Sequence, residues 1–436
     1  MNATHPNCSQ AEHHLSRRSF LNGLSTAGAA LAGSVGSVHL FGEENGLNEA
    51  LKKSGKRVIL LWQAGGASQL ETWNPLPGTA NSGPFAPIPT DVPGTHISEL
   101  MPNMAKRMKD VCAIRSMKTG DGGHGGGAAL MMRGRKDEPN LNYPDIGAIL
   151  SRELARRDSK VPDYVAFYTA TEGRNGSKLT SSFLGARYSP MKLEQEMMPP
   201  NLARHKAITD EDHHARASLQ ALLNERFIDG RSATLRSLPA AYARVHGLMA
   251  SEELFDISKE SAREKERYGP TLFGEQVLMA RRMVEAGVPF VRVARAWWDS
   301  HGQNFETHQE LVPEFDRVLA ALIDDLKERG LFDDVLIVAM GEFGRTPKIN
   351  GSLGRDHFAN AWSTCLAGCG INGGYVHGKT NQDCQEVAED PVSAGDFIAT
   401  ILKAVGVDPH HEYHIGARPV PLVNPGHNPI EACLKA

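Results

Sequence analysis

The residues best suited to chemistry lie between Val335 and Phe358. The unbroken apolar run 335–340 predicts a strand buried on both faces, which is the usual state of a strand in a parallel sheet. Glu342 and Arg345 follow this run directly. Because open α/β sheets bind ligands just beyond the carboxyl ends of their strands, both side chains are expected where chemistry takes place.

An Asp-His pair, Asp356 and His357, follows on the next loop. Together with Glu342, this pair has the donor atoms of a site for a hard or borderline divalent cation. The structural alternative is a salt-bridged loop in which Glu342 pairs with Arg345 or Arg355. Loops often carry functional residues, but residue types alone leave both interpretations open.

Three more predicted strands end in residues that can bind metal ions. Their candidate ligands are the segment 65–71, Asp121 with His124, and Asp299 with His301. If the strands are parallel, their carboxyl ends meet at one edge of the sheet, and these side chains gather there. One or two metal ions held at that edge would polarise a phosphoryl or sulfuryl oxygen and activate a nucleophile.

A side-chain nucleophile is harder to find. Ser68, which follows the small-residue turn 65–67, is the best-placed hydroxyl, and Thr72 and Thr119 are alternatives. None of them lies in the sequence pattern of a nucleophile elbow. A water activated by a metal ion would need no such side chain.

Aromatic and imidazole groups near the same strand end have two interpretations each. Trp297 and Trp298 could line a substrate pocket, because aromatic faces suit sugars or apolar groups, or they could pack in the core. His308 is either a residue that supports the metal site or an exposed residue at a helix start.

Strands alternate with helices along most of the chain, which predicts a parallel or mixed sheet with helices on both faces. The expected strands are 57–62, 111–116, 163–168, 288–294, 335–340 and 363–367. The expected helices are 98–109, 143–157, 272–286, 310–329 and 393–405. The region of about 189–269 is charged, has helical periodicity and lacks convincing strands, so we expect a helical insertion there.

Length and charge limit the classes of function. A chain of 436 residues suits one large α/β domain with an insertion, expected here over 46–436, as well as it suits two domains. The formal net charge of -4 is small for this length and gives no reason to expect binding to nucleic acid or to anionic membranes.

The first 45 residues read as an export segment and linker. Ser16-Arg17-Arg18-Ser19-Phe20-Leu21 has the twin-arginine pattern, and an uncharged stretch of moderate hydrophobicity extends to Leu40. We therefore expect the twin-arginine translocation machinery as a partner and a periplasmic or extracellular location. An N-terminal tail without a signal is the alternative. No second long apolar segment follows, so no membrane span is expected in the mature protein.

The six cysteines give no zinc-ribbon pattern. Cys365 and Cys369 lack cysteine or histidine partners at the required spacing. An oxidising compartment would allow a disulfide, for example between Cys369 and Cys384, but the sequence does not determine the pairing.

Three motifs together resemble a known family. They are GGASQLETWNPLPG at 65–78, WWDSHGQNF at 297–305 and GEFGRTPKINGSLGRDHF at 341–358. With the twin-arginine leader, they resemble the bacterial family named domain of unknown function 1501, which is similar to the alkaline phosphatase and sulfatase superfamily. The resemblance implies an alkaline-phosphatase-like three-layer α/β/α core with a mainly parallel sheet. It also implies a divalent-metal site formed by Asp299, His301, Glu342, Asp356 and His357.

The first motif departs from the pattern of that family. The family commonly has Gly-Gly-Pro-Ser-His-x-Asp-Thr with a further Asp soon after, whereas this chain has Ala67, Gln69, Glu71 and Asn74 at the corresponding positions. Loss of an imidazole and a carboxylate weakens any metal site on this loop. The sulfatase motif Cys/Ser-x-Pro-x-Arg is absent, which argues against formylglycine chemistry.

The sequence leaves two functions open. The leading hypothesis is an exported, metal-dependent hydrolase of phosphate or sulfate esters, with a polysaccharide as one substrate class. Zinc, calcium, magnesium and manganese are all candidate ions. The candidate catalytic residues are Ser68, His124, Arg345 and Arg355, with either arginine stabilising anionic oxygens. The alternative is a non-catalytic protein of the same fold that binds carbohydrate or a partner.

Overall fold

The computed structural model describes residues 46–156, 159, 161–168, 170–171, 175–176, 179–194, 197–199, 202, 207–228 and 252–435. The expected export segment lies outside the described residues. The chain divides into two units, of which the larger comprises 44–411 and 421–436. Strand β17 (Glu412–Ile415) forms a two-stranded sheet with β18 (Arg418–Pro421), and of these residues 412–415 and 418–420 belong to the smaller unit.

A mixed sheet of eight strands forms the centre of the larger unit. In spatial order its strands are β14 (Tyr375–His377), β4 (Val111–Met117), β13 (Trp362–Gly368), β10 (Val335–Met340), β1 (Arg57–Gln63), β9 (Phe290–Arg295), β5 (Tyr164–Phe167) and β8 (Met191–Leu193). Only β13 runs antiparallel to its two neighbours, and the other neighbouring pairs are parallel. Every residue of β10 is buried, as its unbroken apolar sequence predicts.

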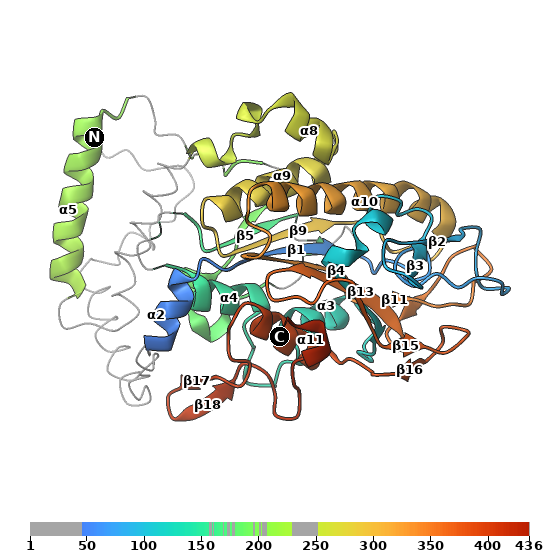
Figure 1. The fold of residues 1–436 in the computed structure, drawn as a ribbon. Coiled ribbons are helices and arrows are strands. Elements are labelled where there is room, and N and C mark those ends of the chain that lie inside the picture. Colours follow the sequence, from blue (N-terminus) through green and yellow to red (C-terminus); the bar gives the residue numbers. More distant parts are fainter. Residues whose placement is uncertain are drawn as a thin grey trace, which may run out of the picture. The chain divides into compact units, whose positions relative to one another are not determined.

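Helices cover both faces of this sheet (Figure 1). Two of them, α9 (Leu272–Glu285) and α10 (Asn304–Glu328), lie on one face, and α3 (His124–Arg133), α4 (Ile146–Leu154) and α11 (Ala394–Ala404) lie on the other. The predicted three-layer α/β/α arrangement with a mainly parallel sheet is confirmed.

The prediction of a helix over 98–109 is wrong. The segment instead continues from β3 (His96–Ser98) into two 3-10 turns, Met104–Lys106 and Met108–Asp110. The carboxylate of Asp316 accepts hydrogen bonds from the backbone amides of Asn103 and Met104, at 3.0 and 2.7 Å. These amides are therefore satisfied by a side chain of α10, and the segment needs no regular helix.

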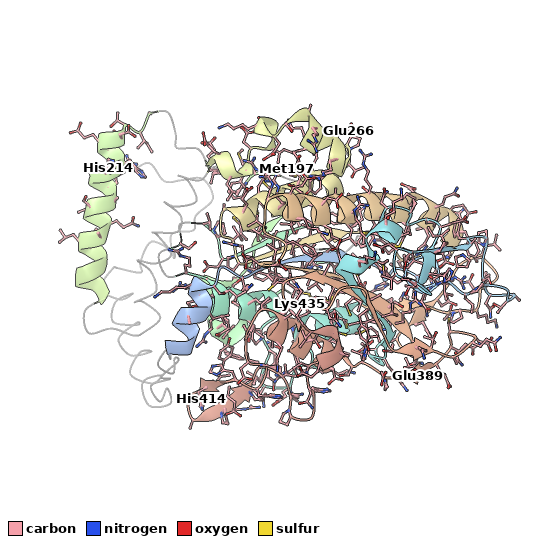
Figure 2. The ribbon with its side chains drawn as sticks, viewed as in Figure 1. Met197, His214, Glu266, Glu389, His414 and Lys435 are labelled. Atoms are coloured by element: carbon pink, nitrogen blue, oxygen red, sulfur yellow. The ribbon has the colours of Figure 1, made fainter. Side chains whose placement is uncertain are left out.

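The predicted helical insertion, 189–269, contains one strand that its sequence does not reveal. Met191–Leu193 forms β8 at the edge of the central sheet, beside β5. Three residues are too few to show a periodic pattern, which explains why this strand was missed. The helical part includes α5 (Asp210–Ile228), on which His214 is exposed, and α8 (Ala262–Tyr268) (Figure 2).

The five described cysteines are free and buried. The disulfide considered between Cys369 and Cys384 is not formed. The Cys369 thiol lies 3.4 Å from the carbonyl oxygen of Ala404, whereas the Cys384 sulfur lies 3.3 Å from the Thr380 hydroxyl. In the part of the chain that the structure describes, no helix has the length and hydrophobicity needed to cross a membrane.

Candidate metal centre

The sheet topology brings the predicted strand ends together. Strands β1, β4, β9 and β10 all point the same way, so their carboxyl ends share one edge of the sheet. Because β13 runs in the opposite direction, the connection 341–361 starts and ends at this same edge. The residues that follow β9, those that follow β10 and those that precede β13 can therefore meet there.

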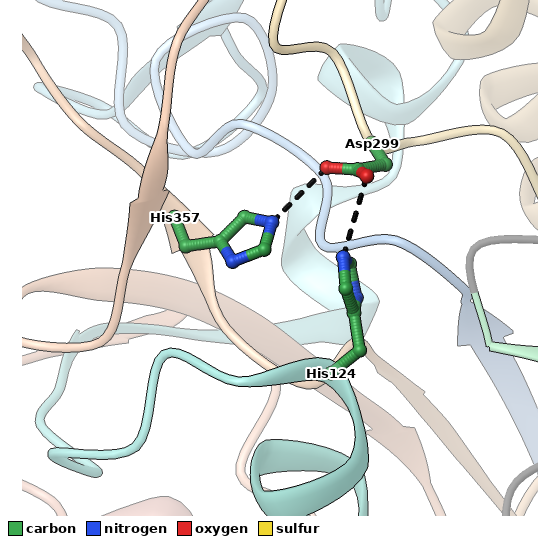
Figure 3. A group of neighbouring side chains, drawn as sticks. All are labelled: His124, Asp299 and His357. Atoms are coloured by element: carbon green, nitrogen blue, oxygen red, sulfur yellow. Dashed lines mark hydrogen bonds and ion pairs between the residues drawn. The ribbon is translucent and has the colours of Figure 1, made fainter.

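Three half-buried side chains form the centre of the cluster: His124, Asp299 and His357. One potential ligand atom of each lies within 4.8 Å of those of the other two. The Nε2 atom of His124 lies 3.3 Å from Oδ2 of Asp299, and Nε2 of His357 lies 3.1 Å from Oδ1 (Figure 3). His124 comes from the start of α3, Asp299 from the loop after β9, and His357 from the connection between β10 and β13.

The far nitrogen of each imidazole is bound to an oxygen that can only accept a hydrogen bond. Nδ1 of His124 lies 2.9 Å from Oε1 of Glu342, and Nδ1 of His357 lies 2.7 Å from the carbonyl oxygen of Gly122. Each Nδ1 must therefore carry the hydrogen, and in the neutral ring each Nε2 presents a lone pair. Metal-binding histidines commonly have this arrangement, in which a carboxylate or carbonyl fixes the tautomer and the ring orientation.

A third imidazole repeats the arrangement at the solvent side of the cluster. Nδ1 of His301 lies 2.8 Å from Oδ1 of Asp356. Its Nε2 lies 2.9 Å from Nε2 of His357 and 3.2 Å from Oδ1 of Asp299. Both His301 and Asp356 are about half exposed, so solvent reaches the cluster from this side.

The predicted ligand Glu342 lies behind His124. Its side chain is fully buried, and Oε1 accepts hydrogen bonds from Nδ1 of His124 and from the amide of Gly65, both at 2.9 Å. Gly65 has a φ of 113°, and an added Cβ would lie 2.5 Å from the backbone nitrogen of Asp299. This close approach explains why a small-residue turn follows β1.

Charges within the cluster shift its protonation equilibria. Burial favours the neutral form of Asp299, but hydrogen bonds from His124 and His357 and the charge of Arg345 outweigh it and lower the pKa of this carboxyl. Burial also opposes the charged form of His124. Hydrogen bonds to Asp299 and Glu342 dominate, however, and raise its pKa to about 9. Without a metal ion, His124 is therefore protonated at neutral pH.

Both predicted arginines are fully buried, and neither pairs with Glu342. Arg345 donates to Oδ1 of Asp299 at 2.7 Å and to the backbone carbonyls of Gly65 and Gly66. Arg355 forms a buried ion pair with Glu71, at 2.9 Å. Their contacts position the loops around the cluster, so neither guanidinium is placed to contact a substrate.

Ser68, the predicted hydroxyl nucleophile, is fully buried. Its amide donates to Nε2 of His308 at 2.9 Å, and its Oγ accepts a hydrogen bond from the amide of Leu70. The hydroxyl is therefore closed to a substrate. His308 is itself fully buried, and its Nδ1 bonds to the carbonyl oxygen of Asn304, so it supports the loops of the site and is not exposed at a helix start.

The unusual residues of the first motif have structural partners. The side-chain amide of Gln69 bonds to both the backbone nitrogen and the backbone oxygen of Arg345, at 2.9 and 2.7 Å. Glu71 is the partner of Arg355. Asn74 donates to the Thr380 hydroxyl at 3.1 Å. These polar side chains hold other loops in place and do not join the metal cluster.

The sequence did not reveal the partners that orient the rings. The sequence predicts His124 at this edge both as a candidate ligand and as a catalytic residue, but nothing in its motif indicates that its Nδ1 faces Glu342. The backbone carbonyl of Gly122 as partner of His357 was also missed. A backbone group leaves no trace in residue type, although the Gly-rich loop 120–127 was a signal that backbone approaches the site closely.

The chain matches one protein family over most of its length. The sequence profile of the family described as "Protein of unknown function (DUF1501)" matches residues 55–434. A comparison with curated protein sequences finds no significant match.

Three solved structures illustrate what the fold is similar to. A sulfatase from Pseudoalteromonas sp. is 14% identical, with a TM-score of 0.39, and the match covers 84% of this chain and 72% of that chain. A protein in the alkaline phosphatase superfamily from Vibrio parahaemolyticus is 12% identical, with a TM-score of 0.37 and coverages of 84% and 77%. A phosphonate monoester hydrolase from Silicibacter pomeroyi is 13% identical, with a TM-score of 0.37 and coverages of 86% and 75%. Because these TM-scores are below 0.5, any statement about chemistry rests on the side chains of the site.

Proposed function

The chain belongs to the family described as "Protein of unknown function (DUF1501)", as its motifs predict, and we propose that it is a metal-dependent hydrolase of phosphate or sulfate esters. One observation carries the proposal. Three imidazoles, those of His124, His301 and His357, each have Nδ1 bound to an oxygen and Nε2 turned toward Asp299. Without a metal ion, protons on these rings hydrogen-bond to Asp299. A divalent cation can replace such protons, because each Nε2 then presents its lone pair to the same point as the carboxylate.

The donor set fits a divalent metal ion. Nε2 of His124 and His357 and the carboxylate of Asp299 provide nitrogen and oxygen ligands of the kind that zinc and manganese accept, and Nε2 of His301 lies beside them. Glu342, Asp356 and the Gly122 carbonyl would then hold the rings from behind. When bound, the ion would supply Lewis acidity to a phosphoryl or sulfuryl oxygen and lower the pKa of a water molecule.

The residues of the chain prepare the site for this chemistry. The charge of Arg345 favours the ionised form of Asp299. Hydrogen bonds to the carbonyls of Gly65 and Gly66 keep this buried guanidinium in position. The exposed pair His301 and Asp356 lies where solvent and substrate enter, so His301 can pass a proton to solvent while Asp356 retains its ring orientation. The three hydroxyls considered as nucleophiles are bonded elsewhere: Ser68 Oγ to the amide of Leu70, Thr72 Oγ1 to the carbonyl of Ser68, and Thr119 Oγ1 to the ring nitrogen of Trp362. This favours direct attack by water.

Metal content measured by elemental mass spectrometry tests the proposal first. We expect bound divalent metal in the full-length protein and its loss in the variant Asp299→Asn combined with His357→Ala. The matched control is His410→Ala, which removes an exposed imidazole that lies outside the cluster. Esters of phosphate and sulfate would then be screened with the loaded protein. Turnover that persists unchanged after thorough chelation would overturn the proposal.

A non-catalytic binding function is the second candidate. It is favoured by the complete burial of Ser68, Arg345 and Arg355, which removes the hydroxyl and both guanidinium groups expected to act on an ester. Metal-independent binding of a glycan without turnover of any ester would support this function. Hydrolysis that depends on the bound metal would exclude it.

Export is part of the proposal as well. It is based on the twin-arginine pattern at 16–21, which lies outside the described residues. A periplasmic or extracellular hydrolase would meet esters carried by polysaccharides. Replacement of Arg17 and Arg18 by lysine should retain the protein in the cytoplasm, and fractionation of cells checks this.

A further inference from the structure

A cavity of about 300 Å³ opens at the carboxyl end of β9, and its wall includes Trp297, which lies two residues before Asp299 in the chain. Its apolar wall includes Tyr168, Phe273 and Trp297, and its polar wall includes Gln276, Arg295 and Glu314. This volume lies at the lower end of the range for ligand pockets, so it suits a ligand of about one ring.

Trp297 is unusual among the tryptophans of this protein. Its exposed fraction is 57%, whereas the other four tryptophans are at most 1% exposed. Its φ of 76° lies in the left-handed region, and Tyr168 on the same cavity has a φ of 45°. A bulky residue in this region is strained, and such strain clusters at functional sites. Two strained aromatic residues therefore face one cavity.

The backbone fixes Trp297 close to the metal centre. Only Trp298 separates it from Asp299, so the two Cα atoms are no more than about 7 Å apart. Trp298 is fully buried, donates its backbone amide to the carbonyl oxygen of Ala64, and packs its ring edge-on against His308. A ligand stacked on Trp297 would therefore be held at a fixed distance from a group bound at Asp299.

The polar wall of the cavity favours a neutral ligand. The charged side chains that line it, Arg295 and Glu314, are bonded to each other at 2.6 Å. Gln276 is almost fully buried, and its side-chain nitrogen donates to the backbone oxygen of Glu194, which fixes the amide in the wall. An internally neutralised ion pair and a fixed amide can bond hydroxyl groups, but they offer no excess charge to an anion.

We propose that the cavity with Trp297 is a subsite for a neutral sugar ring adjoining the ester that the metal centre hydrolyses. An aromatic face on one side and hydrogen-bonding groups on the other match a sugar, which has an apolar ring face and a rim of hydroxyls. The proposal rests on the proposed function for the identity of the neighbouring group, and it makes the alcohol half of the substrate a carbohydrate.

Tryptophan fluorescence tests the subsite without any catalytic readout. Because Trp297 is the one tryptophan with substantial exposure, acrylamide quenches it selectively. Quenching is measured on metal-stripped full-length protein with neutral oligosaccharides, namely cellobiose, lactose and maltotriose. We expect at least one of them to protect the accessible fluorescence in a saturable manner. Protection by phenol and benzyl alcohol but by no sugar would overturn the proposal in favour of an aryl group, and protection by none of the probes would also overturn it.

Calorimetry with variants separates the stacking face from the fold. Trp297→Ala should weaken binding of the protecting sugar about tenfold or more, which corresponds to about 1.4 kcal/mol, whereas Trp297→Phe should retain most of it. Leu219→Ala is the matched control, since Leu219 is also 57% exposed and does not line the cavity. Equal sugar affinity in wild type and Trp297→Ala would overturn the proposal.

The outcomes distinguish the subsite from the hydrolase. Sugar protection in a protein that never binds metal would support the subsite while removing the hydrolase. Metal-dependent ester hydrolysis with no sugar protection would leave the hydrolase and remove the subsite.

Discussion

Replacement of Glu342 by glutamine tests what this carboxylate does. The sequence predicts Glu342 as a metal ligand, whereas in the structure it bonds to Nδ1 of His124, on the side of the ring away from Asp299. The side chain has nearly the same volume, and its remaining oxygen can still accept from the amide of Gly65. What disappears is the negative charge on the acceptor of the His124 Nδ1 hydrogen. Hydrogen bonds to an ionised acceptor are roughly twice as strong as neutral ones, so the orientation and basicity of the ring should both fall.

The expected magnitude is a loss of about 10–100-fold in metal affinity, which is typical for removal of a partner behind a metal-binding histidine. That range corresponds to about 1.4–2.7 kcal/mol. Direct loss of a ligand, as in Asp299→Asn, should cost more than this. The losses of metal affinity in the two variants therefore distinguish a residue that orients a ligand from a residue that is itself a ligand.

Competition with a fluorescent zinc chelator at fixed pH measures these affinities. Glu389→Gln serves as control, because Glu389 is exposed and pairs with Lys379 in a two-stranded sheet outside the cluster. Affinity in Glu342→Gln within twofold of wild type, combined with a large loss in Asp299→Asn, would refute the reasoning that Glu342 orients His124. A loss as large as that of Asp299→Asn would instead make Glu342 a ligand.

Three more predictions concern pH and buried charge. The apparent affinity for zinc should rise about tenfold per pH unit between pH 7 and 9, because metal must displace the proton that His124 holds with a pKa of about 9, and calorimetry in buffers of different ionisation enthalpy should show the released proton. Burial lowers the pKa of His308 from 6.5 to about 4, so on acidification the unfolded state binds a proton before the folded state does. The free energy of unfolding should therefore fall by up to about 3 kcal/mol as the pH drops from about 6.5 to 4. Urea titrations should show this loss in the wild type and not in His308→Gln. Arg355→Met leaves Glu71 charged and buried without its partner, which should cost about 3–5 kcal/mol in urea unfolding, and the double variant with Glu71→Leu should recover most of that loss; equal stability of Arg355→Met and wild type would contradict the pairing.

The fold can be predicted from the sequence where long apolar runs alternate with amphipathic helices. The run 335–340 predicts a fully buried strand, and its parallel pairing with β1 brings the carboxyl ends of the two strands together. Short or locally unusual elements could not be predicted in this way. The strand Met191–Leu193 is too brief for a pattern. In the segment 98–109, the amides of Asn103 and Met104 donate to the carboxylate of Asp316, more than 200 residues away, and no regular helix forms.

The sequence predicts which side chains gather at this edge of the sheet, but it does not predict the role of each. Spacing after the strands identifies His301, Glu342 and His357 as neighbours, because strand direction decides which ends meet. It does not decide which atom of a ring faces inward. That depends on partners such as the carbonyl of Gly122, which have no signature in sequence. Burial of Arg345 and Arg355 was equally hidden, since the groups that accept from their guanidinium groups are mostly backbone oxygens.

The contacts of the first motif bear on how many metal ions the protein holds. In the family pattern this loop offers an imidazole and a carboxylate, which would add to the donors around Asp299. Here the amide of Gln69 spans the backbone of Arg345, and Glu71 is occupied by Arg355. Neither side chain can turn toward an ion without leaving a buried partner unsatisfied.

We therefore expect one equivalent of metal per chain. Among the described residues, the only group of histidine, cysteine, aspartate and glutamate side chains close enough to form a metal site is that of His124, Asp299 and His357. Elemental mass spectrometry of protein saturated with zinc and then freed of loosely bound ions gives the stoichiometry. Restoring the family residue with Gln69→His should not raise it, because the imidazole would face the backbone of Arg345. Two tightly bound ions in the unaltered chain would show that residues of this loop rearrange on metal binding and that the contacts of Gln69 and Glu71 are not their only stable arrangement.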